Sequence, residues 1–338
     1  MKLPVLAWLA LTLLGAAQAQ VAVPQPAASQ EAIGAPQSVA QWLMHLHEAA
    51  RQRAYVGTFV VTAGSYMSSA RIWHVCEGAQ QIERVESLTG VPRTTYRRND
   101  EVMTYLPGNR VVVAEKRAAL GLFPNLLNQA DASIAQFYQL KPLGRDRVAG
   151  LLADVVQLVP RDSWRLGYRV WTEQATGLVI KLQTLDPAQT VLEQAAFSEL
   201  KLAQPVSWAK LAAMMDNTEG YVVKKKELVR TTADQEGWLF KVGVPGFNPV
   251  SCHRHQEGAM AANGGSLQCV FSDGLASVSM FIEAFDAARH SKPQRHDSFA
   301  MGATHMQTRR VGDWWVSAVG EVPQQTLQSF AQGLERKK

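Results

Sequence analysis

The chain has 338 residues, of which 47% are hydrophobic and 19% are charged. That balance is ordinary for a soluble globular protein, and the length is enough for two domains with cores of their own. The formal net charge of +5 at pH 7 suits acidic lipid headgroups or an acidic segment of another protein as partners. Outside the N-terminus no segment is long and apolar enough to span a bilayer as a helix.

Residues 1–19 have the features of a secretory signal peptide. Lys2 supplies a thin basic region, residues 3–14 form an apolar run, and residues 17–19 form an Ala-Gln-Ala cleavage box. The run is shorter than the ~20 residues that span a bilayer, which argues against a membrane anchor. We therefore predict export to the bacterial periplasm, where nucleic acid is not an expected partner.

The first predicted domain comprises residues 38–215 and follows a leader, residues 20–37, that lacks hydrophobic periodicity and is expected to be flexible. Ser38 and Gln41 have the spacing of a helix capping box, which predicts a helix to about residue 51. Beyond it the hydrophobic period changes to two residues, which is typical of short strands in an antiparallel meander. The predicted strands are 55–63, 70–76, 80–88, 93–98, 101–106, 110–114, 145–158, 168–172, 179–185 and 191–200, with helices at 124–138 and 208–215.

Residues 216–237 are polar and contain three consecutive lysines, so we expect a linker there. The second predicted domain, residues 238–335, contains further strands and ends in an amphipathic helix after Pro323. Its predicted strands are 238–242, 247–255 and 311–319, together with a hairpin in residues 267–282.

This hairpin has Asp273-Gly274 as its predicted two-residue type I′ turn, because that pair suits the positive φ angles of such a turn. Ser272 should then face Leu275. The register predicts one serine-rich side and one apolar, core-facing side. The apolar side carries Leu267, Cys269 and Phe271 opposite Met280, Val278 and Ala276, with Ile282 beyond them. We interpret the turn as a folding device and assign it no functional role.

The chain has three cysteines, and export makes a disulfide feasible. Alternation along the strand before the hairpin places Cys252 on the core-facing side, whereas His253 and His255 point away. We therefore predict a disulfide between Cys252 and Cys269, with free buried thiols as the alternative, and assign no role to Cys76. Because these cysteines and histidines lie on opposite sides of the strand, we predict no metal site, and we predict no cofactor.

No catalytic motif stands out, since the sequence contains no G-x-S-x-G elbow, no H-E-x-x-H pair and no P-loop. We therefore do not predict an enzyme. Three aromatic residues, Phe59, Trp73 and Tyr105, lie on different predicted strands of the meander. A curved sheet with all three on its concave face could hold an acyl chain. The alternative is that they pack beneath the helices.

Matching segments along both predicted domains carry a resemblance to a known family. The segments are YVGTFVV from Tyr55, RIWH from Arg71, ERVESLTGVPR from Glu83, RRNDEVMTYLP from Arg97, DRVAG from Asp146, VPRDSWRLGYRVW from Val159, TGLVIK from Thr176, EQAAFSEL from Glu193, VFSDGLASVSMFIE from Val270 and GEVP from Gly320. Taken in this order, the set resembles the MucB/RseB family, periplasmic regulators of the envelope-stress sigma factor of the sigma-E or AlgU type. The chain departs from the family pattern at Thr89 and at Thr94-Thr95, where acidic residues are expected.

The resemblance implies an α+β fold of mostly antiparallel strands. The first domain would be lipid-sensing and similar to the carriers LolA and LolB, which are open half-barrels covered by helices. The second would be a smaller antiparallel sheet that binds the periplasmic part of an RseA/MucA-type anti-sigma factor. Binding would shield that segment from a site-1 protease of the DegS/AlgW type, and lipopolysaccharide or another acyl-chain ligand would release it.

The alternative hypothesis is a periplasmic carrier of lipoproteins or lipids, motivated by the predicted aromatic concave face. The sequence leaves open which ligand is sensed, which side chains contact the partner, and whether the chain forms a homodimer.

Overall fold

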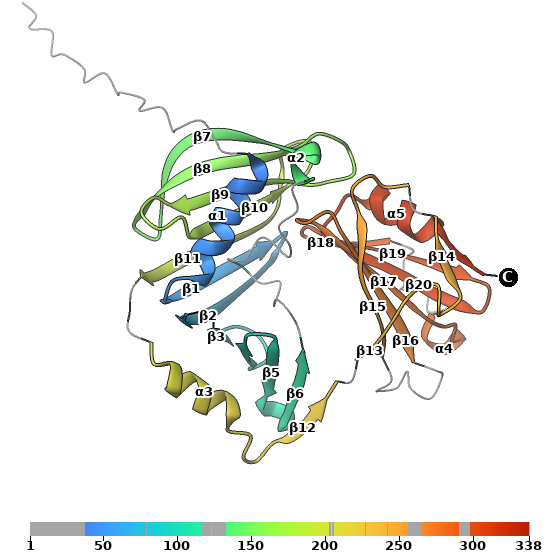
Figure 1. Ribbon diagram of the computed structural model, residues 1–338, viewed down its shortest axis with the longest axis horizontal. Coiled ribbons are helices and arrows are strands. Elements are labelled where there is room, and N and C mark those ends of the chain that lie inside the picture. Colours follow the sequence, from blue (N-terminus) through green and yellow to red (C-terminus); the bar gives the residue numbers. More distant parts are fainter. Residues whose placement is uncertain are drawn as a thin grey trace, which may run out of the picture. The chain divides into compact units, whose positions relative to one another are not determined.

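The computed structural model describes residues 38–78, 80–116, 123, 133–202, 204, 206–226, 228–241, 243–255, 265–290 and 298–337 (Figure 1). The predicted signal peptide and leader, residues 1–37, lie outside the described residues, as does most of the predicted helix 124–138. The described part of that helix is the short α2 (Ile134–Phe137).

The first helix, α1 (Val39–Arg51), has the predicted bounds. The Ser38 backbone N–H donates to Gln41 Oε1 at 3.1 Å, and the Gln41 backbone N–H donates to Ser38 Oγ at 3.3 Å. These reciprocal bonds confirm the capping box. The helix buries Val39, Leu43, Leu46, Ala49 and Ala50 along its apolar face.

The first sheet contains the strands β1 (Tyr55–Ala63), β2 (Tyr66–Glu77), β3 (Gln80–Ser87), β4 (Thr94–Arg98), β5 (Glu101–Leu106), β6 (Val111–Lys116), β7 (Tyr138–Val148), β8 (Leu151–Pro160), β9 (Gly167–Glu173), β10 (Val179–Leu185), β11 (Val191–Leu202) and β12 (Val222–Lys225). A 3₁₀ turn, η1 (Pro107–Asn109), joins β5 to β6. The 12 strands follow the order β12-β6-β5-β4-β3-β2-β1-β11-β10-β9-β8-β7, so the described sheet is open. All pairs are antiparallel except β12 with β6, which confirms the predicted mostly antiparallel class.

One prediction in this sheet is wrong. The predicted single strand 145–158 is two strands, β7 and β8, which pair with each other around a tight turn at Ala149 and Gly150. Both turn residues have positive φ angles, 50° and 83°, which is the backbone geometry of a type I′ hairpin turn. The Ala at the first position concealed this turn, because Asn, Asp or Gly usually occupies it.

The two faces of the first sheet bury separate cores. Ile72 and Val75 are an odd number of positions apart on β2, so they point to opposite faces. Ile72 belongs to the core beneath α1, together with Tyr55 and Phe59. Val75 belongs to the core beneath α3 (Trp208–Asp216), together with Ile82, Tyr96, Tyr105, Val112, Leu211 and Met215. The sheet is therefore covered by helices, as expected.

The segment 216–237, predicted as a linker, contains two edge strands. β12 extends the first sheet by pairing in parallel with β6, and β13 (Leu228–Thr231) extends the second sheet by pairing with β15 (Asn248–His255). All four residues of β12 are exposed, which explains why its polar composition gave no strand signal.

The second sheet has seven strands in the order β13-β15-β16-β17-β20-β19-β18. Its further strands are β16 (Ser266–Ser272), β17 (Ser277–Ala284), β18 (Ser298–Met301), β19 (Thr304–Val311) and β20 (Trp314–Gly320), beside a two-stranded ribbon of β14 (Trp238–Phe240) and β21 (Leu334–Arg336) and the helices α4 (Ala287–His290) and α5 (Gln324–Gln332). The predicted terminal helix is confirmed, and its Leu327, Phe330 and Ala331 are buried in the core of this sheet. The predicted strand 311–319 is displaced, because the turn at Gly312, with a φ of 58°, separates β19 from β20.

The hairpin of β16 and β17 has the predicted faces and a different turn. Ser272 pairs with Ser277, not with Leu275, so the loop contains four residues, 273–276, where two were predicted. Asp273 Oδ1 accepts the backbone N–H groups of Leu275 at 3.0 Å and Ala276 at 2.7 Å, and this side-chain acceptor stabilises the longer loop. The register shifts by two residues, which preserves the face of every side chain, so Cys269, Val278 and Met280 are buried as predicted.

Candidate binding site at the junction of the two sheets

The structure does not place the three predicted aromatic residues on one face. Trp73 lies opposite Val56 in the β1–β2 register, so it faces away from the side that carries Phe59. Trp73 and Tyr105 belong to the core beneath α3, whereas Phe59 belongs to the core beneath α1. The predicted concave face with all three residues is therefore wrong, because sequence alternation within each strand does not fix the pairing between strands.

Tyr105 has a structural contact of its own. Its hydroxyl donates to the backbone carbonyl oxygens of Met215 at 2.6 Å and Asn217 at 3.1 Å, at the end of α3. Burial raises the pKa of Tyr105 to about 12. Two guanidinium groups lie near the Trp73 ring, with Arg84 4.3 Å and Arg71 5.4 Å from its centroid. These contacts agree with the alternative that the two residues pack beneath a helix.

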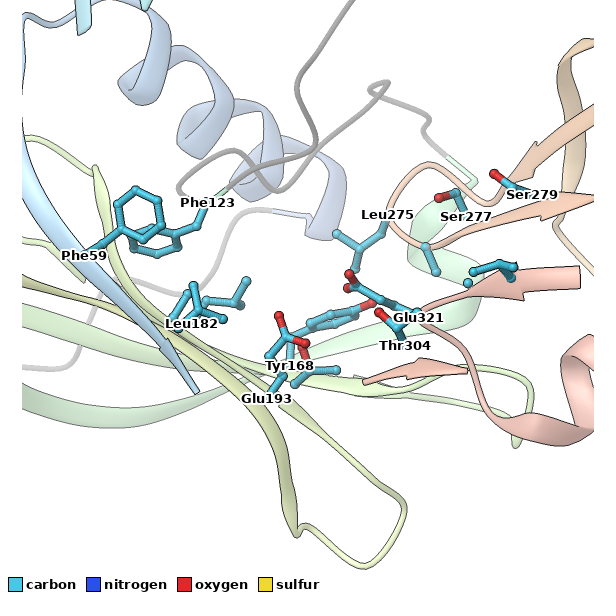
Figure 2. A pocket seen from close by; sticks show the side chains of 16 residues that line it. Phe59, Phe123, Tyr168, Leu182, Glu193, Leu275, Ser277, Ser279, Thr304 and Glu321 are labelled. Atoms are coloured by element: carbon cyan, nitrogen blue, oxygen red, sulfur yellow. The ribbon is translucent and has the colours of Figure 1, made fainter. Parts of the chain in front are cut away.

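Phe59 lies at a cavity of about 490 Å³ that residues of both sheets line (Figure 2). This volume falls within the range of roughly 300–1,000 Å³ that is usual for small-molecule sites. The Phe59 ring contacts Phe197 and Phe123 at centroid distances of 6.2 and 5.7 Å. The full lining is Phe59, Val61, Phe123, Tyr168, Leu182, Thr184, Glu193, Ala195, Leu275, Ala276, Ser277, Ser279, Thr304, Val319, Gly320 and Glu321.

Two carboxyl groups face this cavity, one from each sheet domain. Burial raises the pKa of Glu193 on β11, although the backbone N–H of Ala303 donates to it and partly offsets the rise. Burial, and then repulsion from Glu193, raise the pKa of Glu321 to about 6. The Glu321 carboxyl group lies among protein atoms at the cavity, but the residue as a whole remains exposed to water, which screens part of this effect. Figure 2 shows both glutamates in the cavity, with Tyr168 beside them.

A buried ion pair joins the two sheet domains next to the cavity. Arg165, in the loop between β8 and β9, donates from Nε to Asp273 Oδ2 at 2.6 Å, and both side chains are 0% exposed. Its other nitrogens donate to Asp162 Oδ2 at 2.5 Å and to the Pro245 carbonyl oxygen at 2.6 Å. The guanidinium also lies over the rings of Phe137 and Phe247, at 4.0 and 5.0 Å.

Further contacts surround this ion pair. Thr326 Oγ1 on α5 donates to the Trp164 carbonyl oxygen at 2.8 Å, and Gln325 Nε2 donates to the Ser163 carbonyl oxygen. Gly246 has a φ of 82°, and a Cβ there would lie 2.3 Å from the Phe137 ring and 2.6 Å from Arg165 Nη2, so only glycine fits this close approach.

Sequence reasoning missed Arg165 and assigned Asp273 only to the turn. Asp162 and Arg165 are spaced i, i+3 within the segment VPRDSWRLGYRVW, which offered a local signal of an ion pair. Nothing local indicated that Asp273, 108 residues away, would complete it.

The strand register places Cys252 directly opposite Cys269, and the two residues form a disulfide. Cys76 has no disulfide partner. His255 Nε2 lies 3.0 Å from Gln268 Oε1. Within the described ranges, no three His, Cys, Asp or Glu side chains are grouped so that they could hold a metal ion. None of the helices formed by the described residues has both the length and the apolar composition that crossing a bilayer would require.

Fold and site together define a two-domain β-rich binding protein, with a partly apolar cavity and a buried ion pair where its two sheet domains meet. Two family models match the chain: the MucB/RseB N-terminal domain over residues 38–215 and the MucB/RseB C-terminal domain over residues 232–335. The chain belongs to the MucB/RseB family, which confirms the resemblance seen in its sequence.

Curated relatives match most of the chain. The Sigma factor AlgU regulatory protein MucB of Pseudomonas aeruginosa is 29% identical over 299 residues, covering 86% of this chain and 88% of the relative. The Sigma-E factor regulatory protein RseB of Escherichia coli K12 is 23% identical over 296 residues, covering 87% and 89%. These relatives are regulators of sigma factors.

Solved structures share the fold. The complex structure of Pseudomonas aeruginosa MucA/MucB matches with a TM-score of 0.66 at 25% identity, covering 88% of this chain and 99% of that one. A crystal structure of MucB in complex with MucA(peri) matches with a TM-score of 0.64 at 24% identity, with the same coverage.

Proposed function

We propose that this chain is a periplasmic regulator that binds the periplasmic segment of an RseA/MucA-type anti-sigma factor. The supporting observation is that both family domains are present and that the similar MucB chain was solved in complex with MucA(peri). By covering that segment, the protein would protect it from site-1 proteolysis and keep the sigma factor sequestered.

The proposal includes release by lipopolysaccharide or another lipid. The cavity beside Phe59 offers apolar walls of a size that suits an acyl chain or part of one. Its lining comes from both sheet domains, so a ligand there would contact both. A ligand that binds the free protein better than the complex must weaken the complex by the same factor.

A binding measurement tests the regulator. The purified periplasmic segment of the anti-sigma factor from the same genome is titrated into this protein by calorimetry, with and without lipopolysaccharide. We expect binding that lipopolysaccharide weakens, and slower cleavage of the segment by its site-1 protease when this protein is present. Absence of binding under both conditions would end the proposal.

A cavity variant tests the lipid step separately. Ala195 is buried at the cavity wall, and Ala195→Phe would fill part of the space. We expect this variant to bind the anti-sigma segment and to respond less to lipid. Ala288→Phe, at an exposed position on α4, is the matched control and should respond as the parent chain does. An unchanged lipid response in a folded Ala195→Phe variant would place lipid sensing outside this cavity.

The second candidate is a carrier of lipoproteins or lipids, favoured by the apolar walls of the same cavity. It predicts that an acylated cargo is extracted from vesicles and passed to an acceptor protein, with no affinity for the anti-sigma segment. Cargo transfer without anti-sigma binding would favour the carrier over the regulator.

A further inference from the structure

The polar part of the cavity carries two carboxyl groups, and among the residues that the structure describes no Lys, Arg or His side chain lines it. Glu193 and Glu321 both line it, one from each sheet domain. Among the residues that the structure describes, neither carboxylate forms an ion pair with a Lys, Arg or His side chain. The nearby Arg165 is already engaged by Asp273 and Asp162. The two carboxylates lie in a partly desolvated cavity, where a bound cation would stabilise their negative charge.

Tyr168 supplies a second, independent polar group in the same cavity. The residue is 5% exposed and lines the cavity next to both glutamates (Figure 2). Its hydroxyl forms no hydrogen bond within the described part of the chain, so it is free to accept one from a ligand in the cavity. A ligand that donates a hydrogen bond would satisfy this oxygen.

The rest of the lining combines apolar side chains with the neutral hydroxyl groups of Thr184, Ser277, Ser279 and Thr304. Phe59, Leu182 and Leu275 contribute side chains to the walls, and the carboxyl groups lie beside them in one cavity of about 490 Å³. An occupant must therefore combine an aliphatic part with a polar group that donates hydrogen bonds and is positively charged. A phosphate or sulfate group at this place would be repelled by both carboxylates.

We propose that the cavity binds an amphiphile with a cationic headgroup, an alkyl or acyl chain that ends in a primary ammonium group near Glu193 and Glu321. The ammonium donates to the two carboxylates and to the Tyr168 hydroxyl, and the chain lies against Phe59 and Leu182. This site rests on the proposed lipid-sensing function and gives it a headgroup preference. A phosphate on the same ligand would lie outside the cavity.

Three amphiphiles with the same chain test the preference: octylammonium, octyl sulfate and octyl glucoside, each below its micelle-forming concentration. Their binding to the full chain is measured by calorimetry at pH 7.5. We expect octylammonium to bind roughly tenfold tighter than octyl sulfate or more, since each 1.4 kcal/mol of charge interaction is a factor of ten. The overall charge of the chain is +5, which would favour the sulfate, so an ammonium preference must arise locally.

The double variant Glu193→Gln/Glu321→Gln should lose this preference and keep its affinity for octyl glucoside. The glutamine at 193 can still accept the Ala303 N–H, so the backbone contact is retained. The matched control is Glu77→Gln/Glu219→Gln, which changes the charge equally at two exposed positions and should bind as the parent chain does.

Two outcomes overturn the inference alone. One is octyl sulfate binding as tightly as octylammonium, and the other is an ammonium preference that persists in the Glu193→Gln/Glu321→Gln variant. Failure of all three amphiphiles to bind would overturn the inference together with the lipid step of the proposed function, so the two failures are distinguishable.

Discussion

Replacing Arg165 by Met is expected to destabilise the protein by about 3–5 kcal/mol, the usual cost of removing one partner from a buried ion pair. Met retains much of the aliphatic volume and removes the charge. Asp273 would then be a carboxylate with a 0% exposed side chain and no counter-ion, held only by hydrogen bonds from the Leu275 and Ala276 N–H groups and the Tyr138 hydroxyl. The free energy of unfolding should fall because water stabilises this charge fully in the unfolded chain, whereas the remaining hydrogen bonds stabilise it only partly in the folded one.

The size of the loss follows from the individual contacts of the guanidinium group. The bond to Asp273 at 2.6 Å and the bond to the Pro245 carbonyl oxygen lie in the junction and are lost. Asp162 is 25% exposed and can regain water, so its contribution is small. The contacts with the rings of Phe137 and Phe247 are partly retained by the Met side chain.

Urea unfolding, followed by tryptophan fluorescence, measures this loss in a chain with 9 tryptophans. Arg145→Met is the matched control, because the Arg145 side chain is 55% exposed and lies 3.4 Å from Asp154. This control should change the free energy of unfolding by about 0–1 kcal/mol. If the two domains unfold separately, the transition midpoints are compared one by one.

A double variant separates the ion pair from other effects. Arg165→Met/Asp273→Asn removes both charges, and the asparagine oxygen can still accept the turn N–H groups that Asp273 Oδ1 accepts. We expect it to be more stable than Arg165→Met alone, because no unpaired buried charge remains. A loss for Arg165→Met within about 1 kcal/mol of the control would refute the reasoning, since that is the range of exposed pairs.

Three further predictions follow from single positions. Gly57→Ala should lower the free energy of unfolding, measured in urea, by about 1–3 kcal/mol. The added Cβ would lie 2.6 Å from a phenylalanine ring and 2.8 Å from a backbone oxygen. The control Gly108→Ala should leave the free energy of unfolding unchanged, because a Cβ there meets nothing within 4 Å. The denatured, unreduced protein should show one reactive thiol, and reduction of Cys252–Cys269, which are 17 residues apart, should cost about 3 kcal/mol. The folded state raises the pKa of Glu321 from 4.5 to about 6, so the folded protein should lose a little stability as the pH rises from 4.5 to 6. In thermal melts across this pH range, Glu321→Gln should abolish that loss. A pH profile that is the same in the variant and the parent chain would contradict this prediction.

Several elements of the fold could be read from the sequence, because each has a complete local signal. β1, β5 and β10 have the predicted bounds, since alternating apolar residues end at turn residues on both sides. The α1 capping box was equally local. The predicted faces of the β16–β17 hairpin are correct although its predicted turn is wrong, because a register shift of two residues keeps each strand side chain on the same side of the sheet.

The relation between strands could not be read in this way. Trp73 and Phe59 alternate correctly within their own strands, yet only the β1–β2 register decides that they face opposite sides. β12 and β13 form strands because neighbouring edges offer unpaired backbone groups, and that information lies outside their own residues.

The candidate site depends even more on distant residues. The lining of the cavity joins Phe59 and Glu193 to Leu275 and Glu321, which the sequence places in the other domain. Only the folded structure shows that Glu193 and Glu321 lie together without a cationic side chain among the described residues of the lining. Sequence motifs identified the family, while the charge of the cavity followed from the packing.

Asp273 connects these features physically. Its Oδ1 holds the N–H groups of Leu275 and Ala276, and its Oδ2 accepts Arg165 from the other domain. Leu275 and Ala276 in turn line the cavity. A ligand that displaced Leu275 would therefore disturb Asp273, whose carboxylate forms the ion pair between the two domains. Lipid binding and domain contact would be coupled through one four-residue turn, which gives the proposed release a structural element whose equilibrium both events bias.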